Sequence, residues 1–158
     1  MVNPSTQNPL ADIPFYCEKD NFIGSLANIS ALLMASVPNI NWVGFYLYDG
    51  KSLVLGPFQG RPACTKIAVG KGVCGSAALQ KSTLRVADVD QFPGHIVCDS
   101  QSRSELVVPL LRDQKLYGVL DVDSPQKERF TIQDEIFFEK TVELLMEHLD
   151  FSERTFYE

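Results

Sequence analysis

Three of the four cysteines in this chain fall within one stretch of sequence that also holds a group of carboxylates. The thiols of this stretch and the acids that follow them are Cys64, Cys74, Cys98, Glu105, Asp121 and Asp123. Thiols can form and exchange disulfides, and carboxyl groups held close together can keep protons that they would otherwise lose. These residue types together predict redox chemistry in which an acid can donate a proton.

Two other kinds of site use similar residues. Cys64, Cys74, His95 and Cys98 could supply four zinc ligands. Structural zinc sites mostly use ligand pairs roughly two to four residues apart, however, and only His95 and Cys98 come close to that spacing. A hydrolytic Cys-His-Asp site would have to draw on His95 or His148, and His148 falls in a C-terminal helical pattern. We expect both histidines to lie at the surface.

The length, composition and net charge of the chain limit the classes of partner that it can bind. At 158 residues the chain has the size of one domain, for which roughly 150 residues is usual. Hydrophobic residues make up 45% and charged residues 22%, as in ordinary globular domains. The net charge of -6 argues against nucleic acid and anionic membranes as partners, since a phosphate backbone is bound by clustered Lys and Arg.

The expected compartment bears on the cysteines. No signal peptide is recognisable, and no apolar window reaches the ~20 residues of a membrane span, so we expect a cytoplasmic protein with no membrane contact. Structural disulfides are rare in the cytosol. The cysteines are therefore expected to be buried apolar residues, metal ligands or redox catalysts.

The elements that must position these residues begin with a helix and a hairpin. Three prolines predict an irregular N-terminal arm over residues 1–16. Apolar residues at helical spacing predict a helix over 20–36, and two strands, 41–49 and 53–58, meet at an Asp-Gly turn. Alternation in the first strand puts Trp42 and Tyr46 on one face of the sheet and the neighbouring aliphatic residues on the other.

The second half of the chain contains another hairpin and a long helix. We expect, in order, a strand over 66–69, a helix over 73–80, a strand over 84–87, an irregular loop over 88–104, strands over 105–112 and 115–123, and a helix from a capping box at Thr131 and Asp134 to about Asp150. Asp121 and Asp123 share one face of their strand. The pattern predicts an α+β fold with a central antiparallel sheet and helices packed on it.

A glycine-rich turn, Gly70-Lys71-Gly72-Val73-Cys74-Gly75, matches the dinucleotide-binding fingerprint letter by letter. That fingerprint works within a parallel β-α-β unit, whereas hairpins dominate this chain. A second interpretation is that backbone N–H groups of the turn and the following helix receive a small anion, such as the carboxylate of an amino acid.

Several motifs taken together resemble the free methionine-R-sulfoxide reductases, a branch of the GAF domain family. They are Asn41–Tyr46, Gly56–Gly60, Cys64, Gly70–Gly75, His95–Asp99, Ser104–Pro109 and Gly118–Pro125. The resemblance spans residues 15 to 150, and ordinary GAF domains lack three cysteines at these intervals. It implies a GAF-like fold in a single domain, residues 1–158, and an L-methionine (R)-S-oxide reductase.

The resemblance also implies a role for each cysteine. Cys98 would attack the sulfoxide sulfur, Cys64 would resolve the resulting sulfenic acid as a disulfide, and Cys74 would be an additional thiol able to join the relay. Cys17 matches no family position. Thioredoxin would reset the enzyme, and no metal or organic cofactor is required.

In the same family an acidic cluster holds the sulfoxide, and it corresponds here to Glu105, Asp121 and Asp123. Trp42 and Tyr46 would form the pocket for the methyl group, in agreement with their shared face. Which acid protonates the sulfoxide oxygen stays open, as does the choice between a monomer and a homodimer. A small-ligand-binding or redox-sensing GAF module without turnover is the alternative function.

Overall fold

The computed structural model describes residues 8–152. Its centre is one antiparallel sheet of six strands in the order β3-β2-β1-β6-β5-β4. The elements in chain order are α1 Pro9–Tyr16, α2 Phe22–Ser36, β1 Trp42–Tyr48, β2 Ser52–Gln59, β3 Lys66–Ala68, α3 Gly72–Gln80, β4 Leu84–Val86, the 3-10 helix η1 Val89–Gln91, β5 Ser104–Arg112, β6 Lys115–Ser124 and α4 Ile132–His148. The predicted α+β class and antiparallel sheet are confirmed.

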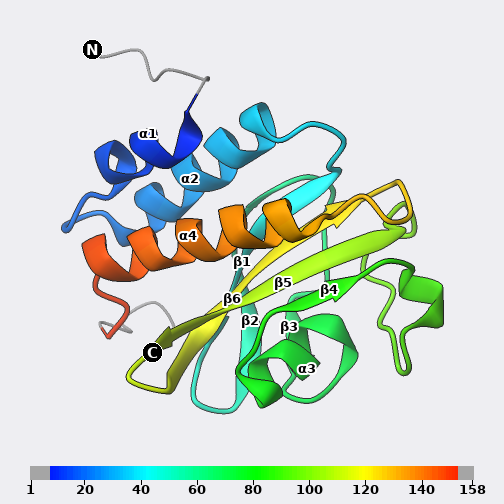
Figure 1. Ribbon diagram of the computed structural model, residues 1–158. Helices are drawn as coiled ribbons and strands as arrows, with labels where there is room; N and C mark the ends of the chain where they lie inside the picture. Colours follow the sequence, from blue (N-terminus) through cyan, green and yellow to red (C-terminus); the bar gives the residue numbers. More distant parts are fainter. Residues whose placement is uncertain (1–7, 153–158) are drawn as a thin grey trace.

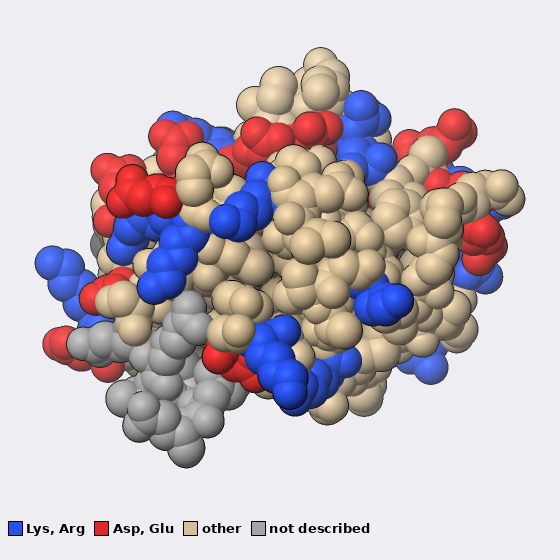
Figure 2. Space-filling model, turned by 90° about the horizontal axis from the view of Figure 1, so that it is seen from below, with Lys and Arg blue, Asp and Glu red and all other residues tan. Residues whose placement is uncertain are grey.

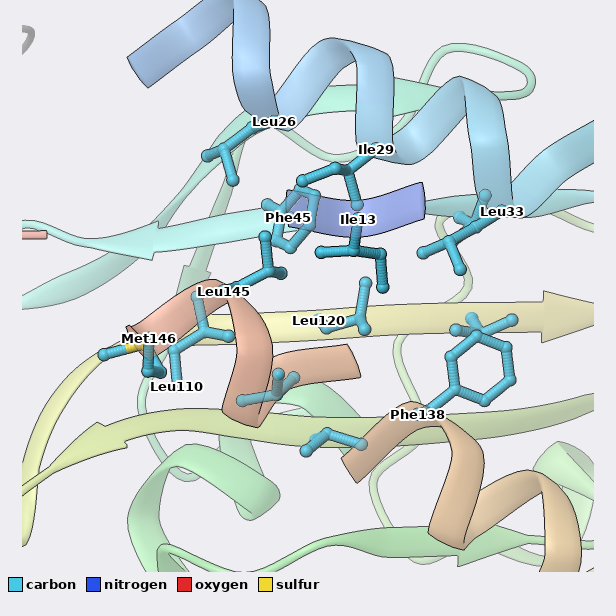
Figure 3. Close-up of a cluster of buried hydrophobic side chains, with 14 of the residues drawn as sticks. Ile13, Leu26, Ile29, Leu33, Phe45, Leu110, Leu120, Phe138, Leu145 and Met146 are labelled. Carbon is cyan, nitrogen blue, oxygen red and sulfur yellow. The ribbon is translucent and has the colours of Figure 1, made fainter. Parts of the chain in front are cut away.

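Helices cover both faces of the sheet. Figure 1 shows α1, α2 and α4 on one face and α3 alone on the other. The first face carries the larger apolar cluster, in which Phe45 of β1, Leu120 of β6 and Phe138 of α4 are all fully buried. Figure 3 shows these side chains meeting between the helices and the sheet. On the second face, α3 packs mainly against β5 and β6.

The alternation predicted for β1 is confirmed. Val43 and Phe45 belong to the cluster under α2 and α4, whereas Trp42 and Tyr46 belong to the cluster under α3. Because successive side chains of a strand point to opposite faces, one strand supplies apolar packing to one layer and aromatic groups to the other.

The prediction of an irregular arm is wrong for Pro9–Tyr16, which form α1; residues 1–7 lie outside the described part. Asn8 caps this helix by accepting a hydrogen bond from the backbone N–H of Ala11. Pro9 stands in the first turn, where a proline costs no hydrogen bond. Burial of Ile13 among α2 and α4 offsets the second proline, Pro14.

The other expected elements are present within a few residues of their predicted ends. The predicted capping box of α4 is confirmed, because Thr131 and Asp134 exchange hydrogen bonds with each other's backbone N–H groups. The irregular loop that the sequence predicted lies between β4 and β5, and it contains one short 3-10 helix, η1. No helix in the described residues is long and apolar enough to cross a membrane.

Candidate active site

A disulfide joins Cys64 to Cys98 on the α3 side of the sheet. The two residues are 34 positions apart in the chain, and their Cα atoms lie 5.3 Å apart. Cys64 belongs to the connection between β2 and β3, and Cys98 to the segment between η1 and β5. Two loops that are distant in sequence are thus held together by one covalent bond, and the resemblance implied this pair.

Next to the disulfide lies a cavity of about 40 Å³. Seven of the eight predicted site residues line it, namely Trp42, Tyr46, Cys74, Cys98, Glu105, Asp121 and Asp123. The eighth, Cys64, is bonded to Cys98 but does not line the cavity. The sheet forms the floor of this site, while α3 and the Cys98 loop contribute its walls and roof.

Strand register brings the three acids together. In the β5–β6 pair, Glu105 lies opposite Asp123. Asp121 lies two residues before Asp123 and points to the same face of β6. The exposed fraction is 7% for Glu105, 8% for Asp123 and 5% for Asp121. Figure 2 views the protein from below, the α3 side in Figure 1, and shows a largely uncharged central surface with scattered Lys and Arg, while Asp and Glu lie mainly toward the edges of the view. The low exposed fractions place the three carboxyl groups inside the protein.

Burial changes the protonation of this cluster. It raises the pKa of Glu105 and of Asp123 well above the usual range of a carboxyl group, and the nearby Asp121 raises both further. Burial also raises the pKa of Asp121, but hydrogen bonding with Glu105, Cys74 and Asp123 opposes that rise. The pKa values of all three acids are therefore raised, and the cluster can keep protons that exposed carboxyl groups would lose. Asp121 Oδ1 is buried and has no hydrogen-bond partner.

Cys74 lies in α3 directly beside the acids. Its thiol donates a hydrogen bond to Glu105 Oε1 at 3.7 Å. Burial and the neighbouring acids raise the pKa of Cys74 well above the ordinary thiol value, so this residue remains a thiol. Ligand atoms of Cys74, Glu105 and Asp121 lie within 4.8 Å of one another. The zinc set considered from sequence is not assembled in this state, because two of its four members form the disulfide.

The two aromatic residues hold the Cys64 loop as well as lining the cavity. Trp42 Nε1 donates to the backbone oxygen of Arg61 at 3.1 Å, and Tyr46 Oη donates to that of Cys64 at 2.9 Å. The Trp42 ring stacks on Tyr46 and on Phe58, with centroids 5.9 and 5.1 Å away. Burial and the nearby acids raise the pKa of Tyr46, which keeps its hydroxyl proton and can serve as a donor.

The glycine-rich turn forms the start of α3 and not a dinucleotide site. The preceding strand, β3, pairs antiparallel with β2, so the parallel unit that a Rossmann fingerprint needs does not include it. Gly70 and Gly72 have φ of 89° and 63°, which favour glycine. A Cβ on Gly75 would come within 2.4 Å of Ala68 O. These glycines are explained by the tight turn and the close contact of α3 with β3.

Sequence reasoning missed three polar residues of the site. His95 is half-buried and lines the cavity, a role that the expectation of a surface histidine did not include; burial lowers its pKa. Asp99 and Ser102 also line the cavity, and both lie in the same loop as Cys98. No periodic pattern marks them, because an irregular loop has no fixed inward face.

Comparison with known proteins agrees with this geometry. The GAF domain family matches residues 25–149. A free methionine-R-sulfoxide reductase of Escherichia coli is 51% identical over 115 residues, which are 73% of this chain and 70% of that protein. This chain belongs to the free methionine-R-sulfoxide reductase family of GAF domains. The predicted family and GAF-like fold are confirmed.

Solved structures of the same family cover almost the whole chain. The reduced form of fRMsr of Staphylococcus aureus is 45% identical, with a TM-score of 0.86, over 95% of this chain and 99% of that chain. The free methionine-R-sulfoxide reductase of Neisseria meningitidis in complex with its substrate is 38% identical, with a TM-score of 0.85. That match covers 94% of this chain and 93% of the other.

Proposed function

We propose that this protein reduces free L-methionine-(R)-S-oxide to methionine and that the electrons come from Cys98 and Cys64. The observation that carries this proposal is the disulfide beside a small cavity lined by three buried acids. The names of the E. coli and N. meningitidis relatives support the substrate and its R configuration. A sensor without turnover needs a ligand pocket but not proton donors beside a redox-active thiol pair.

In the first step, the sulfur of Cys98 attacks the sulfoxide sulfur. The S–O bond of the substrate breaks, its oxygen is transferred to Cys98 as a sulfenic acid, and methionine leaves. Glu105 or Asp123 donates a proton to the sulfoxide oxygen, because burial raises the pKa values of both. Asp121 binds the substrate ammonium through its Oδ1, which is buried and has no hydrogen-bond partner in the described structure. Trp42 and Tyr46 enclose the methyl group.

The attacking thiol must lose its proton beside these acids. Carboxylates near Cys98 oppose thiolate formation, since two negative charges repel each other. We therefore infer that the proton moves from Cys98 to the acid cluster only after the substrate binds. A Cys98 pKa well below neutrality in the free reduced protein would contradict this order of events.

In the second step, the Cys64 thiol attacks the sulfenic sulfur of Cys98. A disulfide forms and the oxygen leaves as water. A dithiol protein of the thioredoxin type then takes the disulfide electrons, in the cytoplasm. Cys74 remains a reserve thiol, held by Glu105 within the cluster. The named groups all come from one chain, so the chemistry does not require a homodimer.

The size of the site favours a free amino acid over a methionine within a protein. A cavity of about 40 Å³ has room for a few water molecules. The substrate is therefore admitted only after the disulfide is reduced, when the Cys98 side chain is no longer bonded to Cys64. Equal turnover of methionine sulfoxide within a peptide would contradict this preference.

The deciding experiment uses the reduced protein without a reductant. Methionine-R-sulfoxide is added, and methionine formed and thiols lost are counted per protein. The proposal predicts one methionine and two lost thiols, and no product from the S isomer. Ligand binding without methionine would indicate a sensor, and thiol loss without methionine would indicate a redox switch. Both outcomes would overturn the proposal.

A further inference from the structure

Asp99 is a buried carboxylate that follows Cys98 directly. Its side chain is 5% exposed. Asp99 Oδ2 accepts a hydrogen bond from Asn41 Nδ2 at 3.2 Å, and the same amide nitrogen donates to Ser102 Oγ at 3.2 Å. The Cys98 loop is thereby attached, immediately after the reactive residue, to the residue that precedes β1.

Asn41 is itself firmly held. Its backbone N–H donates to the backbone oxygen of Asp123 at 3.0 Å, which continues the β1–β6 pairing by one residue. The amide that reaches Asp99 is therefore anchored to the sheet at the position where the acid cluster lies. The remaining Asp99 partners are local or weak: Gln101 N at 2.9 Å in a turn, and the exposed Arg61 at 3.8 Å.

The partner loop is attached to the same strand. Trp42, the next residue after Asn41, donates to the backbone oxygen of Arg61, and Tyr46 donates to that of Cys64. Thus the start of β1 holds both cysteine loops, one through Asn41, which precedes the strand, and one through Trp42 and Tyr46 within it. A disulfide needs Cα atoms within about 4.4–6.8 Å. In the bonded pair those of Cys64 and Cys98 lie 5.3 Å apart, and both loops are attached beside the sheet at this point.

We propose that the hydrogen bond between Asn41 and Asp99 is a latch that positions Cys98 for capture by Cys64. Asp99 and Asn41 are thus positioning residues for the second step of the reaction. In that step the Cys64 thiol attacks the sulfenic sulfur of Cys98, the S–S bond forms, the S–O bond breaks, and the oxygen leaves as water. This inference rests on the proposed function but concerns disulfide closure and not methionine release.

The experiment separates the two steps in single turnovers of the reduced protein. Rapid quenching measures methionine, a 1,3-dione reagent traps sulfenic acid on Cys98, and mass spectrometry of tryptic peptides measures the disulfide. Asp99→Ala removes the latch, whereas Asp99→Asn keeps an oxygen that can accept from Asn41. Asp90→Ala is the matched control, because it removes an exposed acid of η1, which precedes the Cys98 segment in the same connection between β4 and β5.

In Asp99→Ala, we expect disulfide closure to slow at least about tenfold and trapped sulfenic acid to accumulate, since small misplacements of reacting groups cost rates of this order. Release of the first methionine should change less than about threefold. Asp99→Asn should restore closure to within about threefold of the parent, and Asp90→Ala should not affect it.

Asn41→Ala tests the same contact from its other side. If both residues act through one hydrogen bond, the double variant with Asp99→Ala should close no more slowly than the slower single variant. Parent-like closure in Asp99→Ala would overturn the latch, as would an Asp99→Asn variant as slow as Asp99→Ala. Failure of the parent itself to form methionine would instead reject the proposed function.

Discussion

The two faces of the sheet are built from alternate residues of the same strands, yet they differ in chemistry. Under α1, α2 and α4 the buried cluster is made of apolar side chains, with Phe45, Leu120 and Phe138 fully buried. Under α3 the apolar cluster is smaller and borders three buried acids and two loops joined by a disulfide. The first face supplies the larger apolar core, and the second holds the cluster of three buried acids.

This difference shows how the protein can keep acids at low exposure. A buried carboxyl group avoids most of the cost of burial by remaining protonated. The first face supplies the hydrophobic stabilisation that such a site lacks. We therefore expect substitutions on the first face to change stability, and substitutions on the second to change activity and, in some cases, to raise stability.

The largest effect is expected from Cys98→Ser. A serine hydroxyl is a far weaker nucleophile than a thiol, and it cannot form a disulfide, so methionine formation should fall at least ~1,000-fold. The measurement is single-turnover methionine release from reduced protein. A variant that kept a tenth of the parent rate would show that another residue attacks the substrate.

On the apolar face, Phe138→Ala should lower the free energy of unfolding by about 3–5 kcal/mol, because it leaves a cavity among fully buried side chains. Urea unfolding under reducing conditions measures this loss. Leu79→Ala, at an exposed position of α3, is the control and should cost less than about 0.5 kcal/mol. Similar losses of unfolding free energy in both variants would show that the apolar face does not stabilise the fold more than the α3 face does.

Glu105→Gln should affect the acid face in two opposite ways. Loss of a proton donor should lower methionine formation by about 100-fold. The free energy of unfolding at pH 8 should rise by about 1 kcal/mol, because the amide cannot ionise inside the protein. Steady-state kinetics and urea unfolding measure the two changes. A fall in stability would mean that the carboxyl group contributes to the fold.

The pH dependence of stability follows from the same acid. The pKa of Glu105 is raised in the folded protein, so the folded state holds its proton at pH values where the unfolded chain has lost it. Below the unfolded-state pKa of about 4.3, the bound proton makes its whole contribution to the free energy of unfolding. It is lost as pH rises toward the folded pKa. The decline in unfolding free energy over this range should be smaller in Glu105→Gln.

A smaller effect is expected from Trp42→Phe. This change keeps an aromatic ring in the stack but removes the hydrogen bond to Arg61 O, which is worth about 1 kcal/mol. The KM for the sulfoxide should rise about fivefold, measured in steady state. Tyr48→Phe, at the outer end of the same strand, should change KM less than about twofold. An unchanged KM in Trp42→Phe would show that the hydrogen bond to the Cys64 loop does not affect substrate binding.

The smallest effect is expected from Cys17→Ser. Cys17 lies after α1, on the side of the apolar cluster, and donates to Ile13 O at 3.4 Å. Burial raises its pKa to about 11, so it is not a thiolate. Activity should be unchanged, and the unfolding free energy should change by less than about 0.5 kcal/mol. A loss of turnover would place a fourth cysteine in the relay.

Local patterns account for the part of the fold and site that the sequence predicted. Alternation alone assigns Trp42 and Tyr46 to one face, and it puts Asp121 beside Asp123, because a strand has a period of two. The capping box of α4 is likewise a local signal. The helix α1 was missed because its prolines are also local signals, whereas its support comes from Ile13 packing against distant helices.

Long-range geometry was decided only in the tertiary structure. The register of β5 on β6 sets Glu105 opposite Asp123, and the fold brings Cys64 to Cys98 across 34 residues. The contact of Asn41 with Asp99 joins residues 58 apart. The sequence by itself determined which strand residues face the site, because side-chain direction along a strand is a local property of the backbone. Their distances, burial and proton affinities depend on which distant segments pack around them, and only the folded chain determines that.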